Sequence, residues 1–78
     1  EGFGIVLLEA MACRLPIIAS RTGAIPEVLS NGECGILVEP DNPREICSSV
    51  MKLINDQPLQ ETLINNASAR LEKYYAWK

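Results

Sequence analysis

The sequence predicts an α/β fold, in which a small parallel sheet is covered by helices. Two short aliphatic segments, 15–19 and 35–38, show no alternation of polar and apolar residues, which is typical of strands buried in a parallel sheet. Helical patterns flank both segments, and the connections are short. The resulting order of helix, strand, helix, strand, helix, helix favours parallel strands joined by right-handed crossovers. Apolar residues make up 47% of the 78 residues, enough for the packed core of one small domain.

The first helix is expected over residues 5–13, where Leu, Met and Ala dominate and Glu9 is the one break in the apolar run. Gly2 and Gly4 precede this helix and are expected to form a flexible segment that exposes the backbone. The strand at 15–19 then has Pro16 near its start, where a missing N–H group is tolerated. Residues 20–24 form a loop.

Proline and capping residues mark the remaining helices. Pro26 suits the first turn of a short helix, and Glu27 complements the positive end of that helix. After the second strand, Asp41 or Asn42 caps a helix that has Pro43 in its first turn. A last helix starts near residue 56. Because two parallel strands leave both edges of their sheet open, further strands are expected upstream of the first residue.

Composition and charge argue against several classes of function. Ten carboxylates outnumber seven Lys and Arg, and the basic residues are too dispersed to follow a nucleic-acid backbone. With no His and no cluster of Asp, a transition-metal site is not expected. The longest unbroken apolar run, 5–8, is far too short for a membrane span. Cys13, Cys34 and Cys47 are odd in number and widely spaced, which is typical of free thiols in a reducing compartment. We therefore expect a cytoplasmic location, with peripheral membrane attachment of a longer protein as the alternative.

Glu9 is the residue that points most directly to a function. A charged carboxylate in an apolar helix costs several kcal/mol if it stays dry and unpaired. Two interpretations remain open. Either Glu9 points to solvent or to a structural Arg, or it lines a polar cleft and accepts hydrogen bonds from the hydroxyl groups of a ligand.

Glu1 stands eight positions before Glu9, ahead of the expected helix start. With a rise of ~1.5 Å per helical residue and up to ~3.5 Å per extended residue, the two carboxylates are roughly 10 Å apart. That is too far to share one proton or one metal ion, but it suits a grip on two ends of a long ligand. The helix N-terminus between them offers free amides and a positive dipole end, which favour phosphate. A nucleotide sugar, with a diphosphate between two hydroxyl-rich sugars, fits this layout.

The order of motifs is similar to that of a known enzyme family. The segment Glu1-Gly2-Phe3-Gly4-Ile5-Val6-Leu7-Leu8-Glu9 resembles the E-x7-E motif of the family-four retaining glycosyltransferases. Further blocks follow in the family's order at 15–20, 23–28, 31–32 with 35–38, and 40–43. Tyr75-Ala76-Trp77 resembles the aromatic segment after the family's last long helix. The resemblance covers essentially the whole chain.

The resemblance implies a GT-B architecture, in which two Rossmann-like domains face a cleft. Residues 1–78 would be a fragment of the C-terminal, donor-binding domain, without its upstream strands and without the N-terminal acceptor domain. The activity implied is transfer of a glycosyl group from a nucleotide-diphosphate sugar to a carbohydrate, lipid-linked or other acceptor, with retention of configuration. It belongs to carbohydrate biosynthesis and needs no cofactor and no obligatory metal. The isolated 78 residues are expected to be inactive.

Site roles carry over from the same motif. The donor-site positions are Glu1, Gly2, Phe3, Gly4, Ile5 and Glu9. Glu1, the catalytic position, would lie beside the donor sugar's hydroxyls, and positioning with electrostatic stabilisation suits it better than a nucleophilic role. The amides around Phe3, Gly4 and Ile5 would face the sugar and the diphosphate. Glu9 would bind the ribose hydroxyls.

Two positions depart from the family's pattern. Arg14 stands where Gly is common, so it must either bear the strain of a left-handed helix cap or end the helix differently. Cys34 replaces a more usual Asn beside Gly35. These departures affect local turns more than the donor-facing positions.

Other residues and other functions are alternatives to these. Glu27 is a helix-start carboxylate or a site residue, and Gly23 permits either a turn or close approach of a ligand. Cys13 is a poor candidate for a nucleophile because the sequence has no His to activate it. A nucleotide-sugar epimerase of the same fold and a catalytically inactive, truncated nucleotide-sugar-binding remnant are the alternative functions.

Overall fold

The computed structural model describes residues 2–74, with side chains described from residue 6 to residue 73. Its centre is a two-stranded parallel sheet of β1 (Ile18–Ser20) and β2 (Ile36–Val38). The register places Ile18 opposite Ile36 and Ser20 opposite Val38. The predicted parallel sheet is therefore confirmed.

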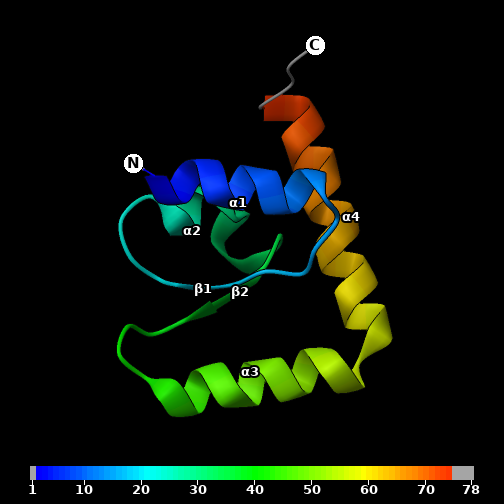
Figure 1. Ribbon diagram of the computed structural model, residues 1–78. Coiled ribbons are helices and arrows are strands. Elements are labelled where there is room, and N and C mark those ends of the chain that lie inside the picture. Colours follow the sequence, from blue (N-terminus) through cyan, green and yellow to red (C-terminus); the bar gives the residue numbers. More distant parts are fainter. Residues whose placement is uncertain (1, 75–78) are drawn as a thin grey trace.

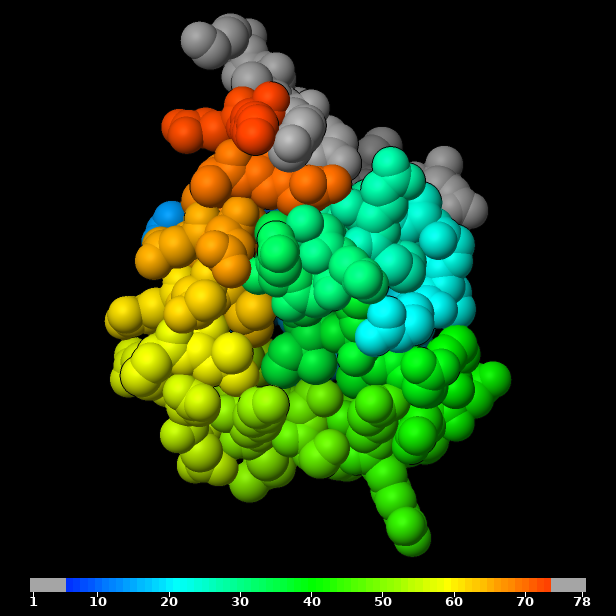
Figure 2. All heavy atoms as spheres, turned by 180° about the vertical axis from the view of Figure 1, so that it is seen from behind, coloured from blue at the N-terminus to red at the C-terminus, as the bar shows by residue number. Residues whose placement is uncertain are grey.

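Helices cover the sheet on both sides. Figure 1 shows α1 (Gly2–Ala12) and α2 (Ile25–Val28) on one side of the strands and α3 (Pro43–Asn55) on the other. A short 3₁₀ turn, η1 (Ser30–Gly32), leads from α2 towards β2. The last helix, α4 (Gln57–Tyr74), runs from the end of α3 back to α1. From the opposite side, Figure 2 shows α4 alongside the η1 segment.

The start of α1 differs from the expectation. The helix begins at Gly2, so Gly2, Phe3 and Gly4 form its first turn and are not a flexible segment. Each glycine disfavours a helix by roughly 1 kcal/mol relative to Ala. Burial outweighs that cost, because Leu7 and Met11 anchor the same helix in the core. The prediction of a non-helical segment before residue 5 was wrong for this reason.

The first strand is shorter than the apolar pattern suggested. It begins at Ile18, and Leu15 is 55% exposed. Ile17 still joins the ladder, because its carbonyl accepts a hydrogen bond of 2.8 Å from the Ile36 N–H. Beside it, Gly35 is closely packed: a Cβ at that position would lie 3.0 Å from the Ile17 carbonyl oxygen. The absence of a side chain at Gly35 thus lets the two strands approach where they begin.

Side-chain caps start the two long helices. Asn42, and not Asp41, caps α3, because its side-chain oxygen accepts a 3.2 Å hydrogen bond from the Glu45 N–H. Asp41 instead adopts a left-handed conformation, with φ of 57°. Asp56 is the single residue between α3 and α4. Its N–H donates to the Leu53 carbonyl at 3.4 Å, and its carboxylate accepts from the Leu59 N–H at 3.0 Å.

The core lies between α1, the sheet and α4. One buried cluster joins α1, α4, the residues on either side of η1 and the residue before β1. Its members are Leu7, Met11, Ile17, Leu29, Cys34 and Ala67. On the other face, α3 contacts both strands and buries Ser49 and Leu53. The core therefore holds α1 beside β1, which is the arrangement that positions the candidate site.

At its other end, α1 stops in a left-handed residue. Arg14 has φ of 58°, its N–H donates to the Met11 carbonyl at 3.1 Å, and the Leu15 N–H donates to the Ala10 carbonyl at 3.1 Å. This pair of bonds is the Schellman arrangement that usually ends on Gly. Of the two possibilities raised by the sequence, Arg14 takes the strained one.

Candidate functional site

The candidate site lies at the carboxyl end of β1. Open α/β sheets bind ligands in the crevice outside the carboxyl ends of their strands. A pocket of about 310 Å³ opens there between α1, β1 and the following loop, and it is lined by Val6, Leu7, Ile18, Ala19, Ser20, Thr22 and Ile25. In Figure 1 the loop after β1 rises towards the first turns of α1. The structure thus brings the N-terminal half of α1 to the edge of the sheet where a ligand is expected.

The first turn of α1 is the part of this site that is suited to negative charge. The first amides of a helix have no partner within the helix, and together with the helix dipole they favour negative charge. Because α1 begins at Gly2, the amides of Gly2, Phe3 and Gly4 belong to this group. Ile5 lies just behind them, at a position where the amide normally bonds within the helix. Val6 follows Ile5 and lines the pocket.

Glu9 lies in the middle of α1 and is exposed. It lies three positions after Val6, so the two share one side of the helix, away from the buried Leu7 and Met11. Within residues 6–73 its carboxylate makes no hydrogen bond or ion pair, and it does not line the pocket that Val6 lines. Contact between Glu9 and a ligand therefore stays a prediction.

The other donor-site positions are only partly described. Glu1 lies outside the described residues, as do Tyr75, Ala76 and Trp77. For Gly2 to Ile5 the backbone is described and the side chains are not. The predicted roles of Glu1 and of the Phe3 side chain therefore stay predictions.

Two hydroxyl-bearing residues that line the pocket were not predicted from the sequence. Ser20 ends β1 and Thr22 follows it in the loop, and the two are joined by a backbone hydrogen bond of 2.9 Å from the Thr22 N–H to the Ser20 carbonyl. Both line the pocket. The signal that could have found them is their position, because polar residues just after a buried parallel strand lie at the edge where ligands bind.

The structure describes the surroundings of three further candidate residues, Gly23, Glu27 and Cys13. Gly23 has φ of 55°, and no atom lies within 4 Å of the place where a Cβ would be. The left-handed turn explains this glycine, and the open space beside it also leaves room for a ligand. Glu27 is exposed in α2 and Cys13 is exposed after α1, and neither lines the pocket at β1.

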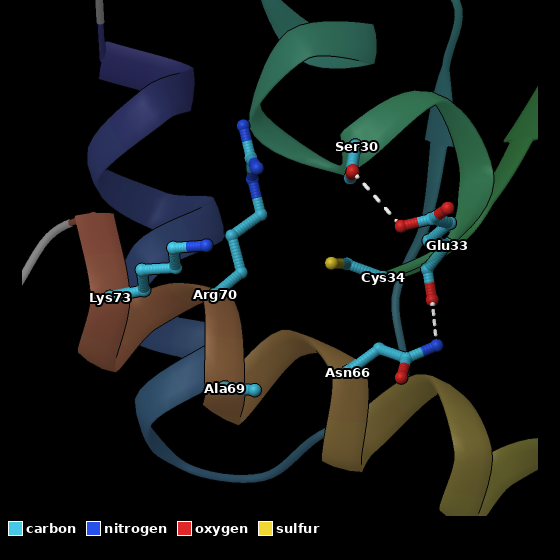
Figure 3. A pocket seen from close by; sticks show the side chains of 7 residues that line it. All are labelled: Ser30, Glu33, Cys34, Asn66, Ala69, Arg70 and Lys73. Carbon is cyan, nitrogen blue, oxygen red and sulfur yellow. Dashed lines mark hydrogen bonds between the residues drawn. The ribbon is translucent and has the colours of Figure 1, made fainter.

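A second pocket lies at the opposite end of the sheet, between η1 and α4. It has a volume of about 300 Å³ and is lined by Ser30, Glu33, Cys34, Asn66, Ala69, Arg70 and Lys73. Figure 3 shows the sulfur of Cys34 pointing into this space, with the Ser30 hydroxyl donating to the Glu33 carboxylate at 3.2 Å. Since η1 precedes β2, this pocket is remote from the carboxyl ends of the strands.

Among the titratable groups that line the second pocket, the Cys34 thiol has a shifted pKa. Burial raises the pKa of its thiol, the positive charge of Arg70 partly opposes the rise, and Glu33 adds to it. Arg70 itself donates to the carbonyls of Val28 at 3.0 Å and Glu27 at 2.7 Å, and so ties α4 to α2. A buried thiol that holds its proton is a poor nucleophile, so Cys34 is a poor candidate for a reactive cysteine.

Two absences complete the description of the site. In the span from residue 2 to residue 74, no group of Cys, Asp and Glu is placed to hold a metal ion. Over the same span, no helix combines the length and the apolar character that a membrane crossing requires.

Comparison with known proteins gives a consistent result. Residues 1–70 match the family model of glycosyl transferases group 1. An uncharacterised glycosyltransferase of Methanocaldococcus jannaschii is 38% identical over 78 residues, covering 100% of this chain and 22% of that protein. The capsular polysaccharide biosynthesis glycosyltransferase CapM of Staphylococcus aureus is 43% identical over 77 residues, covering 97% of this chain and 20% of that protein. The chain thus spans about a fifth of the length of these curated relatives.

A solved structure extends the likeness to three dimensions. The C-terminal domain of the glycosyl transferase group 1 family protein LpcC from Francisella tularensis superposes with a TM-score of 0.85 at 36% identity, covering 100% of this chain and 40% of that one. The predicted fold, part of the C-terminal domain of a GT-B glycosyltransferase, is confirmed. On its sequence and on its fold, this chain belongs to the glycosyl transferases group 1 family.

Proposed function

We propose that these residues form part of the nucleotide-sugar site of a glycosyltransferase. The observation that carries the proposal is the position of the first turn of α1, beside the pocket at the carboxyl end of β1. A helix N-terminus at that edge suits a diphosphate, and the hydroxyls of Ser20 and Thr22 suit the polar groups of a sugar. Membership of the glycosyl transferases group 1 family supports the same conclusion.

The proposed roles follow from this arrangement. The amides of Gly2, Phe3 and Gly4 bind the diphosphate of the donor, where charge grows as the leaving group departs. Glu1 lies beside the sugar, positions it, and stabilises the positive charge that develops at its anomeric carbon. Glu9 binds the ribose hydroxyls from the exposed side of α1. None of these roles requires a metal ion.

The reaction is glycosyl transfer with retention of configuration. The bond from the anomeric carbon to the diphosphate oxygen breaks, a bond to an acceptor oxygen forms, and the acceptor hydroxyl gives its proton to the departing diphosphate. The nucleoside diphosphate leaves with the bonding electron pair. The acceptor domain is not part of these 78 residues in the proposal, so a protein limited to them is inactive in transfer. Carbohydrate biosynthesis in the cytoplasm is the proposed setting, since the S. aureus relative is named for capsular polysaccharide biosynthesis.

Binding to the complete glycosyltransferase polypeptide tests the proposal. Calorimetric titration would use a panel of UDP-glucose, UDP-N-acetylglucosamine, GDP-mannose and ADP-glucose against the wild type, Glu9→Ala and the control Glu61→Ala. Glu61 is a matched control because it is an exposed helical carboxylate on α4, remote from β1. Loss of a carboxylate hydrogen bond to a hydroxyl costs about 1–3 kcal/mol. We therefore expect the Glu9→Ala Kd to rise by roughly 5-fold to 150-fold, with the Glu61→Ala Kd unchanged.

The outcomes separate the parts of the proposal. If no member of the panel binds the wild type, the donor-site assignment fails for these nucleotides. If the wild type binds and Glu9→Ala binds equally well, Glu9 is a solvent-facing structural residue and the site must be redrawn around the first turn of α1. An exchange of configuration at the sugar without transfer would favour the epimerase alternative.

A further inference from the structure

Arg14 ends α1 in a conformation that glycine would adopt more easily. Its φ of 58° lies in the left-handed region, where a side chain crowds the backbone. Residues held in such conformations persist where surrounding contacts fix them, and they are concentrated at functional sites. The contacts of the Arg14 side chain therefore need an explanation.

The Arg14 side chain reaches across to α4 and makes two hydrogen bonds. Its Nη1 donates to the Ser68 hydroxyl at 2.8 Å, and its Nη2 donates to the Asn65 Oδ1 at 2.8 Å. Residues three apart on a helix are neighbours on one face, so Asn65 and Ser68 present their acceptors side by side. A planar guanidinium matches two adjacent acceptors in one orientation, which a flexible ammonium group does not.

These bonds lie where the two helices are separated by a groove. The groove has a volume of about 480 Å³ and is lined by Met11, Ala12, Arg14, Ser68, Ala69, Leu71 and Glu72. Deeper in the core, α1 and α4 meet through the buried side chains of Leu7, Met11 and Ala67. Apolar contacts hold helices together without fixing direction, whereas hydrogen bonds are directional. The core thus keeps α1 against α4, and the two Arg14 bonds add a directional link between the helices.

We propose that Arg14 is a positioning residue for donor binding: its bonds to Asn65 and Ser68 fix the C-terminal end of α1 and thereby aim the first turn at the pocket beside β1. This inference rests on the proposed function. A helix of 11 residues is a rod about 16 Å long, so a small rotation at one end displaces the other. Misplacement of a binding group by about 1 Å is enough to weaken its contribution markedly.

The test compares donor affinity with thermal stability in the complete glycosyltransferase polypeptide. Two variants change Arg14 alone, to Gly or to Lys. The alanine pair carries Asn65→Ala and Ser68→Ala, and the combined variant carries Arg14→Gly together with the alanine pair. Arg44→Ala is the matched control, because Arg44 is an exposed arginine in the first turn of α3. The probe is whichever of UDP-glucose, UDP-N-acetylglucosamine, GDP-mannose and ADP-glucose binds the wild type.

Affinity and stability respond differently if Arg14 positions α1. In Arg14→Gly the relieved backbone offsets the lost hydrogen bonds, so the Tm changes little while the Kd rises about threefold to tenfold. The alanine pair raises the Kd by the same factor, and the combined variant raises it no further. Arg14→Lys, which can serve one acceptor, recovers part of the affinity, and Arg44→Ala matches the wild type.

Three results would overturn the inference. One is an unchanged Kd in the alanine pair, which leaves the backbone of Arg14 untouched and so keeps the test valid if Arg14→Gly does not fold. Another is a rise in Kd that follows the fall in Tm across the variants, because affinity would then be lost only through general destabilisation. The third is a combined variant whose loss of binding free energy equals the sum of the losses in Arg14→Gly and in the alanine pair. If the wild type binds none of the probes, it is the proposed function that fails.

Discussion

Cys34 shows at the residue scale how a departure from the family's pattern is absorbed. It is 3% exposed and belongs to the core cluster with Ile17 and Leu29. A buried thiol packs as a small apolar residue. Where the family more usually has a polar Asn, this chain therefore extends its core.

The stability of the chain should depend on pH through Cys34. Burial, opposed in part by Arg70 and aided by Glu33, raises the pKa of this thiol, so the folded state holds the proton more tightly than the unfolded state. The contribution is fully present below the ordinary thiol pKa of about 8.5 and is lost as the pH rises towards the folded pKa. Urea unfolding of the wild type and Cys34→Ala between pH 7 and pH 10 measures it. The wild type should lose stability more steeply above about pH 8.5, and equal slopes would contradict the assignment.

Capping explains the boundaries of α3 at the element scale. Asn42 and Asp41 are both good capping residues by type, and the sequence could not choose between them. The choice is made by the backbone, because Asp41 occupies the left-handed turn that brings the chain from β2 into the helix. That leaves Asn42 in place to accept the Glu45 N–H.

Asn42→Ala should therefore destabilise the chain, while an exposed change on the same helix should not. Removing a side-chain N-cap costs about 1 kcal/mol, within a range of roughly 0.5–2 kcal/mol. Lys52→Ala, at an exposed position of α3, serves as the control, with an expected change below about 0.5 kcal/mol. Chemical denaturation of both variants gives the difference. Equal stabilities of the two variants would mean that the Asn42 bond contributes nothing.

The elements were predictable where a local pattern decides them, and not where packing does. The parallel strands followed from two unalternating aliphatic segments, and the long helices from their proline and cap signals. The start of α1 was missed because core burial of Leu7 and Met11 overrides two glycines. In the candidate site, the motif singled out residues 1–9, but the exposure of Glu9 and the inclusion of Ser20 and Thr22 in the pocket depend on how α1 lies across β1, which no local pattern specifies.

An apolar surface on α3 becomes apparent at the scale of the whole molecule. Ile46, Val50, Met51 and Ile54 are 43%, 40%, 56% and 64% exposed. Their spacing places them along one side of the helix, next to the side that buries Ser49 and Leu53 against the sheet. Exposed apolar surface of this kind promotes association between molecules.

Charge placed on this surface should reduce self-association without unfolding the protein. Ile54→Glu exchanges a 64% exposed side chain, whereas Leu53→Glu would bury a carboxylate at a position that is 7% exposed. Sedimentation analysis of the 78-residue protein should show less self-association for Ile54→Glu than for the wild type. Circular dichroism should show Ile54→Glu folded and Leu53→Glu largely unfolded, since an unpaired buried charge costs several kcal/mol. Equal folding of the two variants would mean that the described packing of α3 is wrong.

The single residue Asp56 between α3 and α4 fixes how α4 is rotated relative to α3. One residue closes α3 with its N–H and opens α4 with its carboxylate, so no spare length stands between the helices. Each added helical residue would turn everything after it by about 100°. Ala67 would then swing out of the cluster it shares with Met11, and the acceptors Asn65 and Ser68 would leave the reach of Arg14. The length of α3 thus determines where α4 packs, and a one-residue insertion in α3 would displace α4 from α1.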